Sequence, residues 1–303
     1  NGAFADLRTI LQNPDPQVEL AIANSLWARQ GKKFYDDFLQ RNADYFDAEV
    51  AELDFDQPDA AARINSWVEE QTAGKIKDLI QPPIDPLTVL FLINAIYFKA
   101  VWSEPFNPNQ TRELPFHLSD GNTKEIPMMS REGQFRCLEQ EGFQAISIPY
   151  GKTERLSMYL FLPETGQSLD DFYERLTPEM WSGWMDLFRD SEAYLRLPRF
   201  EFEYEVSLND ALKAMGMEIA FKAGAADFSK MKPVPPDMFI AEVKHKTFVE
   251  VNEKGTEAAA ATSVEIRDES APAFYMVMDR PFFFSIVDNK TGSILFMGQV
   301  TDP

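Results

Sequence analysis

Residues 87–98 read LTVLFLINAIYF, a nearly continuous apolar run that constrains the fold more than any other segment of the chain. Pro82, Pro83 and Pro86 precede the run, and charged residues follow it. Twelve residues are too few to cross a bilayer as a helix, which takes about 20. Because the run is rich in β-branched and aromatic side chains, we expect a β-strand that is buried on both faces. The chain therefore has to place structure on both sides of this strand.

Segments before this run favour helices more than segments after it. Residues 4–11 and 59–76 are helical in pattern, and Ile64 and Val68 would share the apolar face of the second helix. Residues 19–29 and 33–47 are expected to form either helices or strands.

Strands dominate the rest of the chain, apart from a helix over residues 168–187. They are expected at residues 123–129, 134–138, 145–149, 156–162, 193–205 and 241–252, with a hairpin formed by 282–287 and 293–300. Ser207 would cap a short helix through Met215, with Asp210 completing a capping box and Gly216 ending the helix. Without regular alternation of strands and helices, the pattern predicts an α+β fold with large antiparallel sheets, in one domain over residues 1–303.

The charge of the chain limits its partners. There are 29 basic and 49 acidic side chains, for a formal net charge of −20. Such a surface repels a phosphate backbone, so we expect no nucleic-acid partner. No apolar run is long enough for a membrane helix, so we expect no membrane partner either. The single cysteine, Cys137, lies in a strand-like segment and is expected to be a buried, unreactive thiol.

The motifs of common enzyme classes are missing from the sequence. His117 and His245 are the two histidines, and neither lies in an HExxH segment. The sequence also lacks a CxxC pair, a GxSxG elbow and a glycine-rich phosphate loop. We therefore expect neither an enzyme nor a bound cofactor or metal.

Residues 253–270 carry an alternation that predicts two conformations. Small or apolar side chains occupy every second position: Thr256, Ala258, Ala260, Thr262, Val264 and Ile266. The intervening positions hold every charge between 256 and 267, in the set Glu257, Ala259, Ala261, Ser263, Glu265 and Arg267. In an extended strand the two sets face opposite sides, so one face could be buried while the other meets water. A flexible linker and a short alanine helix remain alternatives.

Residues 251–262 read VNEKGTEAAAAT, and residues 94–102 read NAIYFKAVW. These long motifs resemble the hinge and the central-strand signature of the serpins, a family of serine protease inhibitors. Residues 64–76 are similar to the helix that lies across the main sheet, and residues 279–282 and 295–298 to the C-terminal strands. The resemblance runs from Phe4 to Pro303 in the family's order.

The resemblance implies a fold in which helices pack on three mostly antiparallel sheets with an exposed reactive-centre loop, here residues 253–273. It also implies a mechanism. A target protease attacks the loop and forms an acyl-enzyme, and the loop then inserts into the main sheet and traps the protease as a covalent complex. The implied hinge is Glu253, Lys254, Gly255, Thr256, Glu257, Ala258, Ala259, Ala260, Ala261 and Thr262.

Further roles also come from the resemblance. Glu253 would pair with Arg199, in the same region as Trp102, and Asn94 and His245 would form a polar pair where the central strands part. Counting from Gly255 places the cleaved bond at Glu269–Ser270. Counting back from Pro281 would suggest Ser270–Ala271 instead.

The residues near the bond suggest which proteases are targeted. Glu269 favours a glutamyl-specific protease, and a shift in register to Arg267 would favour a trypsin-like enzyme. Serine proteases are the expected targets, with cysteine proteases as a second class. A non-inhibitory serpin acting as carrier, chaperone or storage protein is the alternative function.

The family normally has three helices and a strand before the point that matches Phe4. We therefore expect that the native protein either has an associated N-terminal fragment or is a longer chain. We also expect it to be a monomer. The compartment, secreted or cytoplasmic, stays open.

Overall fold

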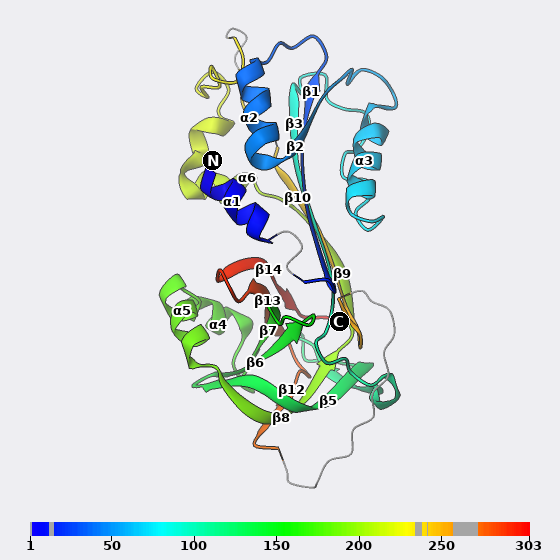
Figure 1. The fold of residues 1–303 in the computed structure, drawn as a ribbon, viewed down its shortest axis with the longest axis vertical. Helices are drawn as coiled ribbons and strands as arrows, with labels where there is room; N and C mark the ends of the chain where they lie inside the picture. The colour runs from blue at the N-terminus through cyan, green and yellow to red at the C-terminus, as the bar shows by residue number, and fades with distance from the viewer. Residues whose placement is uncertain (1, 12–14, 234–237, 241, 257–271) are drawn as a thin grey trace. The chain divides into compact units, whose positions relative to one another are not determined.

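The computed structural model describes residues 2–11, 15–233, 238–240, 242–256 and 272–303. The chain forms two compact units. The first comprises Asn1–Gln12, Leu20–Phe98 and Phe202–Phe248, and the second comprises Asn13–Glu19, Lys99–Glu201 and Val249–Pro303. Figure 1 labels the elements in chain order.

Six helices and three short helical turns are described. They are α1 (Gly2–Leu11), α2 (Asp36–Phe46), α3 (Ala60–Gln71), η1 (Pro108–Gln110), α4 (Leu169–Arg175), α5 (Pro178–Leu187), α6 (Asn209–Leu212), η2 (Lys213–Met217) and η3 (Glu218–Phe221). None of the described helices is long and apolar enough to span a membrane.

The described strands form two hydrogen-bonded sheets. The first runs β2-β1-β3-β10-β9, with β11 on β3, and consists of β1 (Val18–Arg29), β2 (Ala48–Leu53), β3 (Leu90–Val101), β9 (Phe200–Ser207), β10 (Lys244–Val251) and β11 (Gly255–Thr256). The second runs β12-β8-β5-β6-β7-β13-β14, with β4 on β5, and consists of β4 (Arg112–His117), β5 (Thr123–Gln140), β6 (Phe143–Tyr150), β7 (Leu156–Pro163), β8 (Arg189–Pro198), β12 (Phe274–Val277), β13 (Phe282–Asp288) and β14 (Ser293–Val300).

The long strand β5 explains why two sheets are found where the resemblance implies three. Its first part pairs with β4 and its last part with β6, while β8 runs along its middle. One continuous strand thus belongs to both neighbouring ladders, and these ladders form a single hydrogen-bonded sheet.

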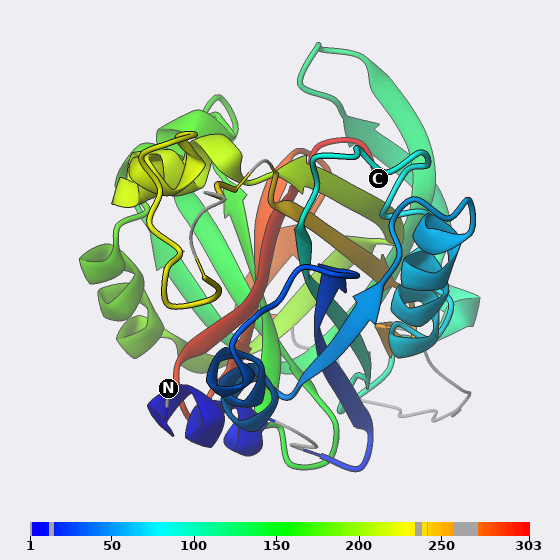
Figure 2. The same ribbon diagram turned by 90° about the horizontal axis from the view of Figure 1, so that it is seen from above.

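In the first unit, β1 is covered on both faces. Leu26 and Ala28 pack with Phe38 and Leu39 of α2. Trp27 belongs instead to the core cluster that contains Ile64 and Val68 of α3. Successive strand residues point to opposite faces, so the two helices lie on opposite sides of this strand. Figures 1 and 2 show α2 and α3 on either side of the sheet.

The apolar run after Pro86 forms a strand, but its burial on both faces was wrongly predicted. Within the described residues, Ile93 and Ala95 are buried against α3, while Leu92 is 56% exposed. The other face of β3 is therefore covered only in part, because Leu90 packs with Leu26 and Ala28 while Leu92 stays exposed. Consecutive burial begins only at Tyr97 and Phe98.

Two helix predictions also need correction. Helix α3 ends at Gln71 and not at Ile76, because the chain turns there and Gly74 N–H donates to the carbonyl of Glu69. Ser207 does not cap a helix. It ends β9, and the cap position of α6 is Leu208, which makes no side-chain cap. The pairing of β9 within the sheet takes precedence over the local capping signal.

The core of the second unit is built from aromatic side chains. Phe143, Phe161 and Phe283 from the sheet pack with Phe172 of α4 and Trp184 of α5. The predicted helix 168–187 is split into these two helices, because Thr177 and Pro178 begin a new one. Cys137 is buried, and this burial together with the charge of Asp190 raises its pKa to about 12. Its thiol is therefore protonated at neutral pH.

Candidate functional site

The proposed hinge begins with a tight reversal of the chain in the second unit. Strand β10 ends at Val251, and Asn252 and Gly255 then exchange two backbone hydrogen bonds of 3.0 and 3.2 Å. Glu253 and Lys254 form the two-residue turn between them. The amide oxygen of Asn252 accepts from the backbone N–H of Lys254, which fixes the turn locally.

Three successive carbonyls of this turn are held by the segment that follows β3. The indole N–H of Trp102 donates to Asn252, the N–H of Phe106 to Glu253 and the N–H of Trp102 to Lys254, at 2.8–2.9 Å. The turn is therefore hydrogen-bonded on its backbone as well as through its side chains.

Gly255 is the residue that this geometry requires. Its φ is +145°, and a Cβ there would lie 2.1 Å from the carbonyl oxygen of Ala100 and 2.8 Å from the backbone nitrogen of Trp102. These are backbone atoms in a paired strand, so they cannot move aside. Gly255 and Thr256 form β11, which pairs antiparallel with Val101 and Ala100 of β3.

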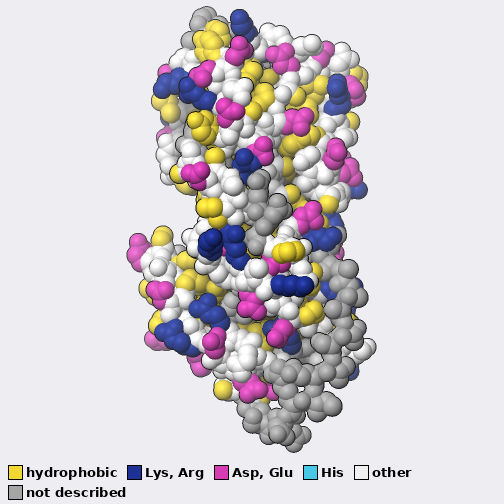
Figure 3. All heavy atoms as spheres, in the orientation of Figure 1, with side chains coloured by type: hydrophobic (Ala, Val, Ile, Leu, Met, Phe, Trp, Pro, Cys, Tyr) yellow, Lys and Arg dark blue, Asp and Glu magenta, His cyan; other side chains and the backbone are white. Residues whose placement is uncertain are grey.

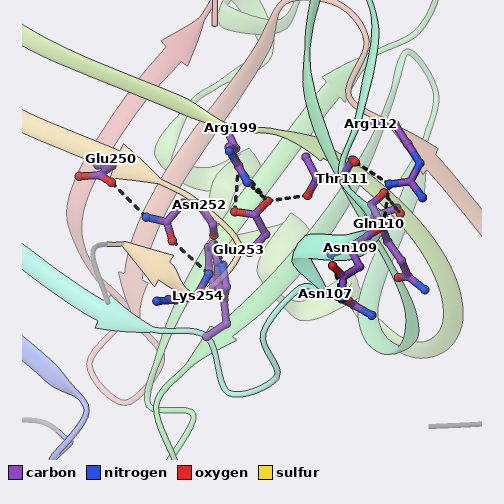
Figure 4. Close-up of polar contacts among 12 residues, drawn as sticks. Asn107, Asn109, Gln110, Thr111, Arg112, Arg199, Glu250, Asn252, Glu253 and Lys254 are labelled. Atoms are coloured by element: carbon purple, nitrogen blue, oxygen red, sulfur yellow. Dashed lines mark hydrogen bonds and ion pairs between the residues drawn. The ribbon is translucent and has the colours of Figure 1, made fainter. Parts of the chain in front are cut away.

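The carboxylate of Glu253 is the charged centre of the site (Figure 4). Its side chain is 6% exposed. Arg199 Nε donates to both carboxylate oxygens at 2.8 and 2.9 Å, and Arg199 Nη2 and the hydroxyl of Thr111 also donate to it. Burial alone would raise the pKa of Glu253, but the hydrogen bonds from Arg199 and Thr111 hold that pKa below its ordinary value. The group is thus an anion paired with a half-exposed cation.

An aromatic group lies against the first hinge residues. Trp102 stacks on Tyr150 with ring centroids 4.4 Å apart, and Phe106 meets Trp102 edge-on at 6.3 Å. The hydroxyls of Tyr150 and Thr256 are 3.0 Å apart, and both residues are buried. Burial raises the pKa of Tyr150, so its hydroxyl stays protonated. The side chain of Thr256 therefore points into the core of this unit.

Asn94 and His245 lie in the first unit and line one cavity of about 270 Å³. Asn94 donates from its amide to Asn24 at 2.9 Å, and Leu26 and Leu92 form part of the apolar wall. Burial lowers the pKa of His245, which favours the neutral imidazole at neutral pH. In the described part of the chain, no three His, Cys, Asp or Glu side chains are grouped to hold a metal ion.

The family model described as "Serpin (serine protease inhibitor)" matches residues 1–303. The chain belongs to the serpin family. Its α+β architecture with several sheets is the serpin fold.

Relatives and solved structures agree with this assignment. Serpin B10 of Rhinolophus ferrumequinum is 38% identical over 99% of this chain and 77% of its own. The native thermophilic serpin tengpin has a TM-score of 0.86 and 34% identity, over 95% of this chain and 75% of its own. Thyroxine-binding globulin in complex with thyroxine has a TM-score of 0.87 and 30% identity, over all of this chain and 80% of its own.

The described structure brings together part of the expected serpin site. Glu253, Lys254, Gly255 and Thr256 lie beside Trp102 and Arg199 in the second unit. The remaining residues of the proposed hinge (Glu257, Ala258, Ala259, Ala260, Ala261 and Thr262) lie outside the described residues, as do Glu269 and Ser270 of the proposed bond.

Two contacts of the site were missed from the sequence. Thr111 contacts Glu253 and Tyr150 contacts Thr256, from 142 and 106 positions away in the sequence, respectively. Neither side chain belongs to a motif with a chemical signature, so only the three-dimensional arrangement reveals them.

Proposed function

We propose that this serpin is a suicide inhibitor of serine proteases, with cysteine proteases as a second class of target. Residues 1–303 would act as one serpin domain whose reactive-centre loop, 253–273, inserts into the first sheet after cleavage. The observation that carries the proposal is the position of Thr256 at the start of the loop. This residue is the first member of the small-residue set, its side chain is buried to 2% exposure, and it is paired with β3. The rest of that set follows at every second position.

The strand directions favour such an insertion. Strands β3 and β10 are parallel neighbours, with Ala95 opposite Lys246. The chain that leaves the turn runs antiparallel to β3. A strand continued between them would replace one parallel ladder with two antiparallel ones, which add backbone hydrogen bonds and are slightly more stable per residue. This gain would supply the free energy that holds the trapped protease.

The chemical step belongs to the protease. Its nucleophile attacks the carbonyl carbon of Glu269, the bond to Ser270 breaks, and the new amine of Ser270 takes up a proton. The Glu269 acyl group is left as an ester on a serine protease, or as a thioester on a cysteine protease. Insertion of the loop then displaces the protease and distorts its active site, so water does not complete the cleavage.

The target class follows from the residue before the bond. Glu269 suits a protease with a basic primary pocket, and a glutamyl-specific enzyme is the first choice. A register shift would present Asp268 to the same class, or Arg267 to a trypsin-like enzyme, the second choice. A bond at Ser270–Ala271 would change this assignment.

A carrier function is the second candidate. It is favoured by the similarity to thyroxine-binding globulin, which was solved with thyroxine bound. The hinge of the present chain counts against it, because residues 256–266 place no proline or charge on the inserting set.

Incubation with a panel of proteases tests the proposal. An SDS-stable complex with a glutamyl-specific or trypsin-like protease is expected. The variant Ala258→Arg should turn the inhibitor into a substrate, because arginine would have to enter the core on insertion. Ala259→Arg is the matched control on the opposite set and should keep the complex. Cleavage by every protease without any covalent complex would support the carrier function instead.

A further inference from the structure

Two stacked tyrosines lie on the second sheet where the described chain resumes after the loop. Tyr275 of β12 is the register partner of Tyr194 of β8, and Figure 1 shows these strands side by side. Their ring centroids are 4.9 Å apart with an angle of 9° between the planes. Tyr275 is nevertheless 55% exposed, whereas its neighbours Phe274 and Met276 are buried. The strand is thus anchored while its tyrosine faces solvent.

Arg196 completes this group from the same face of β8. Its Nε donates to the hydroxyl of Tyr194 at 2.9 Å, and its guanidinium lies 5.4 Å from the centre of that ring. We name Tyr194, Arg196 and Tyr275 the tyrosine surface. Tyrosine and arginine are enriched among the residues that dominate binding energy in protein interfaces. Rings that are already stacked lose little conformational freedom when a partner binds.

The position of the tyrosine surface determines what could reach it. Tyr275 follows the proposed bond at Glu269–Ser270 by five residues. Even a fully extended chain spans at most about 18 Å over that stretch. A protease domain of roughly 200 residues has a radius of gyration of about 16 Å, so its body is wider than this span. A protease bound to the loop therefore extends as far as β12.

We propose that the tyrosine surface is a contact site for the body of the target protease, beside the part of its cleft that holds the residues after the bond. This inference rests on the proposed function. It adds a determinant of target choice outside the loop. The tyrosine surface suits a protease with an apolar recess beside a carboxylate, because the tyrosine rings would fill the recess and Arg196 would meet the charge.

Association kinetics test the inference with the protease that forms the covalent complex fastest. Tyr275→Ala should lower the second-order rate constant about tenfold, and Tyr275→Phe, which keeps the ring, less than about twofold. Met297→Ala is the control, since Met297 is 61% exposed on β14 at the other edge of this sheet. The number of inhibitor molecules used per protease should stay unchanged in all three variants, because insertion does not involve these side chains.

Equal rate constants for the parent protein and Tyr275→Ala would overturn the inference, as would an equal loss in Met297→Ala. A failure of the proposed function looks different, since no covalent complex would then form with the parent protein. In that case the rate of loop cleavage is compared instead. Slower cleavage of Tyr275→Ala would still support the contact, and equal cleavage would reject it.

Discussion

Arg199 holds Glu253 through both carboxylate oxygens, across 54 positions of sequence. The arrangement is asymmetric, because the side chain of Glu253 is 6% exposed and that of Arg199 is 44% exposed. Removing the cation would leave a buried charge, whereas neutralising the carboxylate would not. We therefore predict that Arg199→Met lowers the melting temperature more than Glu253→Gln, with a cost of about 1–3 kcal/mol for the latter.

The same pair makes stability depend on pH. The folded-state pKa of Glu253 lies below its ordinary value near 4.5. Its contribution is therefore fully present above that value and is lost as the pH falls through the folded-state pKa. The fall in melting temperature between pH 7 and about pH 3 should be smaller for Glu253→Gln than for the parent protein. An identical fall would contradict the assigned role of this carboxylate.

Gly255→Ala should be strongly destabilising because of the backbone beside it. The added methyl group would meet the carbonyl oxygen of Ala100 at 2.1 Å. We expect a loss of about 3 kcal/mol, measured as a shift in thermal or urea unfolding. The matched control is Gly121→Ala. Gly121 also has a positive φ, of +85°, but nothing lies within 4 Å of its Cβ position, so only the backbone cost of about 1 kcal/mol applies. Equal losses would mean that crowding at Gly255 is unimportant.

The hydroxyls of Tyr150 and Thr256 should be energetically coupled. Tyr150→Phe or Thr256→Val alone leaves the other buried hydroxyl without this partner, at a cost of about 1–2 kcal/mol each. The double variant should lose about 1 kcal/mol less than the sum of the two single losses. Unfolding of the four proteins measures this cycle. Strict additivity would show that the contact contributes nothing.

Asp288 provides a test of buried charge away from the hinge. Its side chain is fully buried, and Arg155 donates to both of its oxygens at 2.8 and 2.9 Å. Burial raises the pKa of Asp288, but the hydrogen bonds from Arg155, Lys290 and Thr291 outweigh this effect and lower it overall. Asp288→Asn should therefore cost about 3 kcal/mol at neutral pH and much less in acid.

The control for Asp288 is a surface pair in the same unit. Lys124 and Asp302 have side chains that are 47% and 61% exposed. Asp302→Asn should change stability by less than about 1 kcal/mol. If both substitutions had the same small effect, the burial of Asp288 would have no energetic consequence.

Local sequence patterns predicted what local interactions decide. The hairpin of β13 and β14 was predictable, because two apolar strands flank a polar turn that ends at Gly292. The helix start at Ser207 was predicted wrongly, because a capping signal cannot reveal that the same residue completes a strand. The exposure of Leu92 on β3 was not predicted for a similar reason, because hydrophobicity alone does not say which faces of a strand are covered.

Some features of the site could be predicted from the sequence, and others could not. Glycine at 255 and small residues at alternate positions are visible in the sequence, and the partnership of Glu253 with Arg199 came from the family resemblance. The contributions of Thr111 and Tyr150 depend on how the end of η1 and strand β6 are placed, which no spacing in the sequence encodes.

The charge of the chain is spread over the face shown in Figure 3. Acidic and basic side chains are interspersed over the face shown there, so the net charge of −20 is not gathered into one acidic patch on that face.

The closed turn between Asn252 and Gly255 has a kinetic consequence for the proposed inhibitor. A new strand normally has to be nucleated, and bringing its ends together costs entropy before any ladder forms. Here the reversal is complete and the first two rungs, Gly255 and Thr256, are already in register with β3. The new strand could therefore extend one residue pair at a time from a ladder that already exists. The rate of this extension would be set by how fast β3 and β10 separate.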